Sequence, residues 1–306
     1  MMGVIDRCVL VTRTTQLQEL LERFTTVEQT KFYMESAGED FASVLQRHTV
    51  YDESVMRITK AIPRGMKFVK LDRAFLPQFE FRPDDVVLAV GQDGLVSNTA
   101  KYLSGQALLG INPDPAYYEG VLLPWTTLSF GAALAALTGG HAKSQSVTLA
   151  VARTNDGREL LAFNDLFIGQ TGHSSALYEI AYGSKREFQS SSGIIVSTGA
   201  GATGWMRSIQ SNALKLAATK GTPFPNLSRE SEALVFAVRE AWPSKTTAAN
   251  LVFGQIDPGK HLTVHSRMGK GGVIFSDGIE WDNLEFNAGR QVQISAAKQK
   301  TRLVVP

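Results

Sequence analysis

Three short segments carry carboxylate, amide or hydroxyl side chains, in two of them among glycines, and each lies next to an apolar run that predicts a strand. In Gly91-Gln92-Asp93-Gly94, the glycines can let backbone N–H groups approach a phosphorylated ligand, and Asp93 can accept a proton from an attacking hydroxyl. In Asn164-Asp165, a carboxylate beside an amide can grip vicinal hydroxyls. Each segment alone is equally typical of a polar turn at a strand end, so the chemistry rests on their combination.

The third segment, Gly199-Ala-Gly-Ala-Thr-Gly204, matches the G-x-G-x-x-G turn of dinucleotide-binding Rossmann folds. It stands between an expected strand at 193–197 and an expected helix at 205–218. A Rossmann oxidoreductase is nevertheless disfavoured, because the turn lies in a β-rich half of the chain. In addition, the region about 20 residues later, where an acidic residue is required, reads Gly-Thr-Pro-Phe-Pro-Asn.

The composition indicates a soluble protein with two domains: 306 residues, 43% hydrophobic and 20% charged, with a net charge of +2. This charge balance argues against a nucleic-acid or membrane binder. Cys8 is the single cysteine, so an intrachain disulfide is excluded, and the five histidines lack metal-ligand spacing. The sequence has no signal-peptide pattern and no apolar stretch of membrane-spanning length, so we expect a cytoplasmic protein.

The first 125 residues alternate between strand and helix patterns, which predicts an α/β domain with a largely parallel sheet. Ligands of such sheets bind beyond the carboxyl ends of the strands, which is where Asp93 would lie. The expected strands are at 3–12, 85–90 and 107–111, and the expected helices are at 16–24, 52–62 and 97–105.

After a further expected helix at 126–138, the chain becomes strand-rich, with one helix at 205–218. Thr154-Asn-Asp-Gly157 predicts a hairpin turn. We therefore expect a second, β-rich domain, with ligand bound in the cleft between the two domains. The basic pair Arg267 and Lys270 has two interpretations: it binds phosphate, or its side chains are simply solvated in a hairpin turn. The expected strands are at 147–153, 159–163, 176–182, 193–197, 233–239, 261–265, 272–276 and 291–295.

In this order the segments resemble the NAD kinase family, from about residue 4 to the end of the chain. Gly91–Gly94 is similar to the family's Gly-Gly-Asp-Gly, and Asn164-Asp165 stands where the family carries Asn-Glu. The mitochondrial-type branch looks most similar. The further matching segments are Gly110–Asn112, Asn112–Pro115, Ser191–Gly193, Ser192–Trp205, Val264–Arg267 and Ser276–Gly278.

The resemblance implies transfer of the γ-phosphoryl group of ATP to the 2′-hydroxyl of the adenosine ribose of NAD, with Mg²⁺ as the divalent metal. It implies an α/β ATP-binding domain at 1–125 and a β-sandwich-like NAD-binding domain at 126–306, whose last segment is a candidate to pack back on the first domain. It also implies a homodimer or homotetramer.

The same resemblance assigns roles to residues. Asp93 would be the catalytic base, and Gly91 and Gly94 would line the phosphates of ATP. Asn164 and Asp165 would hold ribose hydroxyls of NAD. No protein ligand to the metal is assigned. The other expected nucleotide-binding positions are Gln92, Asn112, Ser192, Ser197, Thr198, Gly201 and Thr203.

Gln92 replaces a glycine of the family's phosphate loop, and a glutamine would be strained there if the position requires a positive φ. This departure favours an alternative, a non-catalytic nucleotide-binding homologue that acts as a sensor or regulator. A lipid or polyol kinase of the same superfamily is a third interpretation. The sequence leaves open whether the donor is ATP or polyphosphate, and whether the acceptor is NAD or NADH.

Overall fold

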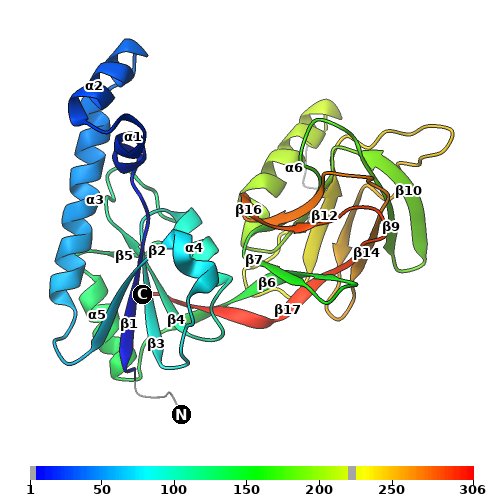
Figure 1. The fold of residues 1–306 in the computed structure, drawn as a ribbon. Helices are drawn as coiled ribbons and strands as arrows, with labels where there is room; N and C mark the ends of the chain where they lie inside the picture. The colour runs from blue at the N-terminus through cyan, green and yellow to red at the C-terminus, as the bar shows by residue number, and fades with distance from the viewer. Residues whose placement is uncertain (1–4, 220–224) are drawn as a thin grey trace. The chain divides into compact units, whose positions relative to one another are not determined.

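The computed structural model describes residues 5–219 and 225–306, and its chain separates into two compact units (Figure 1). Unit 1 runs to Gln145 and also contains Arg302–Pro306, whereas unit 2 comprises Ser146–Thr301. Unit 1 extends 20 residues past the expected boundary at 125, because helix α5 (Phe130–Thr138) packs in its core. Residues 3 and 4 of the expected first strand, and part of the Gly-Thr-Pro-Phe-Pro-Asn stretch, lie outside the described residues.

Unit 1 is built on a parallel sheet, which confirms that prediction. Its strand order is β2–β1–β3–β4, and β2 was not predicted from the sequence. Every residue of β3 and β4 is buried, which suits strands covered by helices on both faces. The C-terminal end of β17 and the short β5 both pair in parallel with β4. The strands are β1 (Arg7–Thr12), β2 (Lys67–Asp72), β3 (Asp85–Val90), β4 (Ala107–Asn112) and β5 (Trp125–Thr126).

Helices α3 (Phe41–Ala61) and α5 cover one face of this sheet, where Tyr51, Ile58 and Phe130 join the apolar core. Helix α1 (Gln16–Phe24) has the predicted bounds, because Thr15 and Gln18 form a capping box at its start. The remaining helices of the unit are α2 (Val27–Ser36), the 3₁₀ helix η1 (Arg73–Gln78) and α4 (Asp93–Ala100).

Two helix predictions were wrong at their start. The helix expected at 52–62 is the second half of α3, which begins at Phe41 after the capping residue Asp40. The helix expected at 97–105 begins at Asp93 as α4, because Gln92 adopts the extended conformation of a helix N-cap. Asp93 therefore stands in the first turn of a helix rather than in a loop.

Unit 2 contains two antiparallel sheets that enclose one apolar core, which confirms the predicted β-sandwich-like domain. One sheet has the order β13–β12–β11–β8–β15–β16, and strands β9, β10, β14, β17, β6 and β7 face it. Side chains alternate along β8: Leu166 and Ile168 point into this core, whereas Phe167 packs with Met206 of helix α6 (Trp205–Leu216) on the other face.

The unit 2 strands are β6 (Ser144–Thr154), β7 (Glu159–Ala162), β8 (Asp165–Gln170), β9 (Ala176–Tyr182), β10 (Lys185–Ser191), β11 (Ile194–Ser197), β12 (Leu234–Val238), β13 (Phe253–Ile256), β14 (Leu262–Ser266), β15 (Gly272–Ser276), β16 (Ile279–Glu285) and β17 (Gln291–Val304). The edge strands β10 and β16 were not predicted, because their sequences are mostly polar. In the described part of the chain, none of the helices has the length and apolarity needed to cross a membrane.

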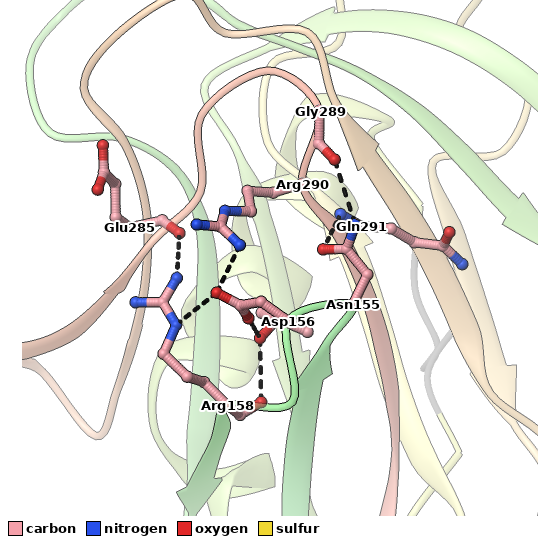
Figure 2. Close-up of polar contacts among 8 residues, drawn as sticks. Asn155, Asp156, Arg158, Glu285, Gly289, Arg290 and Gln291 are labelled. Atoms are coloured by element: carbon pink, nitrogen blue, oxygen red, sulfur yellow. Dashed lines mark hydrogen bonds and ion pairs between the residues drawn. The ribbon is translucent and has the colours of Figure 1, made fainter.

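The predicted hairpin turn at Thr154–Gly157 joins β6 to β7 and is tied to the start of β17 (Figure 2). Asp156 accepts hydrogen bonds from Arg158 Nε at 2.9 Å and from Arg290 Nη1 at 2.5 Å. Asn155 donates to the carbonyl of Gly289 and accepts from the N–H of Gln291. The hydroxyl of Thr154 and the two arginines lower the pKa of Asp156.

We expect Asp156→Asn to lower the melting temperature at neutral pH, because the amide loses both charged partners. A carboxylate with a lowered pKa stabilises the fold above its unfolded-state pKa, and this contribution disappears as the pH falls through the folded-state pKa. The difference in melting temperature between wild type and variant should therefore shrink in acid. Glu159→Gln, which removes only an exposed pair with Arg153, is the matched control. An equal change in melting temperature in both variants would show that the ion pairs of Asp156 do not stabilise the fold.

Candidate functional site

The segment Gly91–Gly94 turns the chain from β3 into α4. The N–H of Gly91 donates to the carbonyl of Ile111 at 3.2 Å, and a Cβ on Gly91 would lie 3.1 Å from Leu95 Cδ2. Gln92 has a φ of −103°, a conformation open to any residue. The strain considered for glutamine at this position is therefore absent.

The carboxylate of Asp93 accepts two backbone hydrogen bonds from the loop that follows β4. Val121 N–H donates to Oδ2 at 3.1 Å, and Leu122 N–H donates to Oδ1 at 2.8 Å. The side chain is only half-buried, so lone pairs of the carboxylate remain open to a ligand. Asp93 thus fixes this loop and still presents a group that can accept a proton.

Asn112 shapes the same loop from its other end. Its Nδ2 donates to the carbonyl of Tyr118 at 2.9 Å, and its Oδ1 accepts from Asp114 N–H at 3.0 Å. Gly120 has a φ of +67°, and a Cβ there would lie 2.7 Å from Asn112 Nδ2. The amide of Asn112 is therefore engaged in holding the loop together.

In unit 2, Asp277 fixes the backbone of Asn164 and Asp165. Its carboxylate accepts from the N–H groups of Phe163 at 3.0 Å, Asn164 at 2.6 Å and Asp165 at 3.2 Å. In return, Asp277 N–H donates to the carbonyl of Asp165 at 2.9 Å, and Asp277 adopts a φ of +54°. Ser276-Asp277-Gly278 was noted in the sequence, but nothing local pointed to this role.

The glycine-rich turn packs directly on the same backbone. The Thr198 hydroxyl donates to the carbonyl of Phe163 at 2.6 Å, and Thr198 N–H donates to that of Asn164 at 2.9 Å. A Cβ on Gly201 would lie 2.3 Å from the carbonyl oxygen of Asn164, so only glycine fits there. The turn follows β11, which pairs antiparallel on both sides, so the parallel βαβ unit of a Rossmann site is excluded.

Asn164 and Asp165 keep polar groups that the protein itself does not satisfy. Asp165 Oδ1 is buried without a hydrogen-bond partner, and the Asn164 side chain makes no hydrogen bond within the described part of the chain. Burial raises the pKa of Asp165 to about 7, with a further rise from Asp277 and a partial offset from the Ser197 hydroxyl. Hydroxyl groups of a ligand would supply the donors that Asp165 lacks.

A pocket of about 230 Å³ adjoins this turn and is lined by Ser197 and Thr198 together with apolar side chains such as Met206, Leu227 and Val235. Thr203 is exposed in the 3₁₀ helix η2 (Gly201–Thr203). The structure brings Asn164, Asp165, Ser197, Thr198 and Gly201 together. Ser192 lies apart from them, because it precedes β11 and five residues of extended chain span about 17 Å.

Within residues 5–219 and 225–306, no group of three or more His, Cys, Asp or Glu side chains is placed to hold a metal ion. The basic pair noted in the sequence, Arg267 and Lys270, lies between β14 and β15, where the backbone of both residues takes part in strand-end hydrogen bonds.

No protein-family model matches the chain, and no curated protein matches it in sequence. The structure is nevertheless similar to that of yeast NADH kinase complexed with NADH, with a TM-score of 0.64 and a sequence identity of 11%. The match covers 98% of this chain and 84% of the yeast chain. This likeness shows that the chain has the two-domain fold of an NAD kinase-like protein.

We expect the free energy of unfolding of the wild type to fall as the pH rises from about 4 to about 7, because a buried acid with a raised pKa binds its proton more tightly in the folded state. A pKa raised from 3.8 to about 7 corresponds to a cost on the order of 4 kcal/mol for ionising Asp165. Asp165→Asn should remove this pH dependence in denaturant unfolding. An unchanged pH dependence would show that Asp165 ionises without cost.

Proposed function

We propose that this protein is an NAD kinase that transfers the γ-phosphoryl group of ATP to the 2′-hydroxyl of the adenosine ribose of NAD. One observation carries the proposal. Asn164 and Asp165 retain unsatisfied polar groups on a backbone that Asp277 holds in place. Such a site matches two vicinal ribose hydroxyls, which donate and accept hydrogen bonds at a fixed spacing. The NADH bound to the yeast protein of the same fold supports a dinucleotide as the ligand.

In the proposed reaction, the 2′-hydroxyl oxygen attacks the γ-phosphorus of ATP. The new O–P bond forms as the bond from the γ-phosphorus to the bridging oxygen breaks, so NADP and ADP are produced. Asp93 accepts the proton that the hydroxyl releases. Proton loss accompanies bond formation in this type of reaction, so a carboxylate can serve as the base.

Magnesium enters this proposal with the substrate. Mg²⁺ would arrive bound to the phosphates of ATP, as is usual for an ion that keeps most of its water ligands. We also propose a homodimer or homotetramer, which sedimentation velocity would test.

One observation favours a second candidate, an NAD-binding protein without kinase activity. Both carboxylate oxygens of Asp93 accept loop N–H groups, so a purely structural requirement can account for this residue. The extended backbone of Gln92 weighs the other way, since the substitution in the phosphate loop brings no strain. Activity measurements separate the two candidates.

The decisive experiment incubates the protein with NAD, ATP and Mg²⁺ and detects NADP with an NADP-specific dehydrogenase. We expect the wild type to form NADP, and Asp93→Asn to lose nearly all turnover while it still binds NAD. Asp93→Asn also changes the group that accepts the N–H groups of Val121 and Leu122. Thermal unfolding of the variant shows whether this change destabilises the fold. NADP formation by Asp93→Asn at the wild-type rate would refute the role of Asp93 as the general base. NAD binding without turnover in the wild type would establish the non-catalytic candidate.

We expect Asn164→Ala to weaken NAD binding by about tenfold, because it removes the side-chain amide next to Asp165, which makes no hydrogen bond within the described part of the chain. Isothermal titration calorimetry with NAD measures this loss. Asn212→Ala, on an exposed face of α6, is the matched control. Equal affinities for both variants would place the ribose elsewhere.

A further inference from the structure

One turn of helix α3 places two buried hydroxyl groups against the sheet of unit 1. Tyr51 is 7% exposed and Ser54 is 5% exposed. Because the two residues are three positions apart, both lie on the buried face of α3. A buried hydroxyl group costs free energy unless it forms hydrogen bonds, so the partners of these two groups indicate their role.

The Tyr51 hydroxyl joins the ends of β1 and β3. It accepts from the N–H of Arg13 at 2.9 Å and donates to the carbonyl of Val90 at 3.1 Å. Arg13 directly follows β1, and Val90 is the last residue of β3. Burial raises the pKa of Tyr51 to about 12, so the hydroxyl keeps its proton at neutral pH and remains a hydrogen-bond donor.

The Ser54 hydroxyl extends this link to β4. Its Oγ donates to the carbonyl of Pro113 at 2.9 Å and to that of Val50 at 2.7 Å, so the two carbonyl groups share its single hydrogen. Pro113 directly follows β4. Strands β1, β3 and β4 are neighbours and run parallel, so one turn of α3 is tied to three adjacent strand ends.

The ties to β3 and β4 lie on the two sides of the contact between Asp93 and the loop after β4. On one side, Val90 stands three residues before Asp93. On the other side, Pro113 begins the loop whose N–H groups at Val121 and Leu122 donate to the Asp93 carboxylate. A shift of either strand end would therefore move Asp93 relative to this loop.

Arg13 carries the link from β1 to the middle of the same loop. Its Nη2 donates to Tyr118 Oη at 3.0 Å, and its guanidinium lies 5.1 Å from the ring centroid of Tyr51. The carbonyl of Tyr118 accepts from Asn112 Nδ2 at 2.9 Å. The loop is thus held at its start, its middle and its end by groups that lead back to the same turn of α3.

From these contacts we propose that Tyr51 and Ser54 are positioning residues, whose hydroxyl groups fix Asp93 against the loop at 113–122. A phenylalanine ring would fill the same space in the core as the ring of Tyr51, so the hydroxyl contributes its hydrogen bonds rather than packing volume. The consequence for catalysis rests on the proposed function, in which Asp93 must be held within reach of the hydroxyl whose proton it accepts.

The first test is amide hydrogen exchange in the full-length protein, measured by NMR, which requires no activity. The N–H groups of Val121 and Leu122 are the reporter amides, because they donate to the carboxylate of Asp93. We expect both reporter amides to exchange about fivefold faster in Tyr51→Phe and in Ser54→Ala, since each variant removes a hydrogen bond that holds a strand end.

Thr59→Ala is the matched control, because it removes an exposed hydroxyl of α3 that donates within the helix to the carbonyl of Val55. Ile168, in the core of unit 2, is the reference for global unfolding. Unchanged reporter amides, or equal acceleration in the control or at the reference, would overturn the proposal. Ser54→Ala keeps the test valid if Tyr51→Phe unfolds, which thermal unfolding monitors.

The second test measures NADP formation by the same variants. We expect kcat to fall by about tenfold in Tyr51→Phe and in Ser54→Ala, because a displaced base reacts slowly. The dissociation constant for NAD should stay unchanged, because Asn164 and Asp165 belong to unit 2. A wild-type kcat in both variants would overturn their role as positioning residues. Absence of NADP formation by the wild type would reject the kinase, and the exchange rates would then decide whether the two hydroxyl groups position Asp93.

Discussion

The candidate site in unit 2 depends on one carboxylate that accepts three consecutive backbone N–H groups. Asp277 holds the N–H groups of Phe163, Asn164 and Asp165, and its own backbone adopts a positive φ to do so. Because Asp277 accepts these N–H groups, the backbone that carries the side chains of Asn164 and Asp165 is fixed. A site held by its own backbone in this way needs little reorganisation when a ligand binds.

The cost of this arrangement appears in Asp165. Its burial without a full set of donors raises its pKa to about 7, so ionising this carboxyl group is unfavourable. Perturbed pKa values of this kind cluster at functional sites. The glycine-rich turn contributes to the same frame through Thr198 and Gly201, which pack on the backbone of Phe163 and Asn164.

In unit 1 the parallel sheet positions the residues of the candidate site. Strands β1 and β3 are neighbours and run in the same direction, so the residues that follow them, Arg13 and Gly91-Gln92, emerge at the same edge. Helix α3 brings Arg47, which lies 34 positions after Arg13 in the sequence, to the same edge. Topology therefore gathers positive charge next to the residue proposed as the base.

Local patterns in the sequence were sufficient for the two-domain architecture, the bounds of α1 and the hairpin at Thr154–Gly157, because caps and turns act over a few residues. They also singled out Asp93, Asn164 and Asp165. The start of α4, the clamp by Asp277 and the meeting of Arg13 with Arg47 required the folded chain. Those features join residues far apart in the sequence, and charge or hydrogen-bonding capacity at one position does not reveal its distant partner.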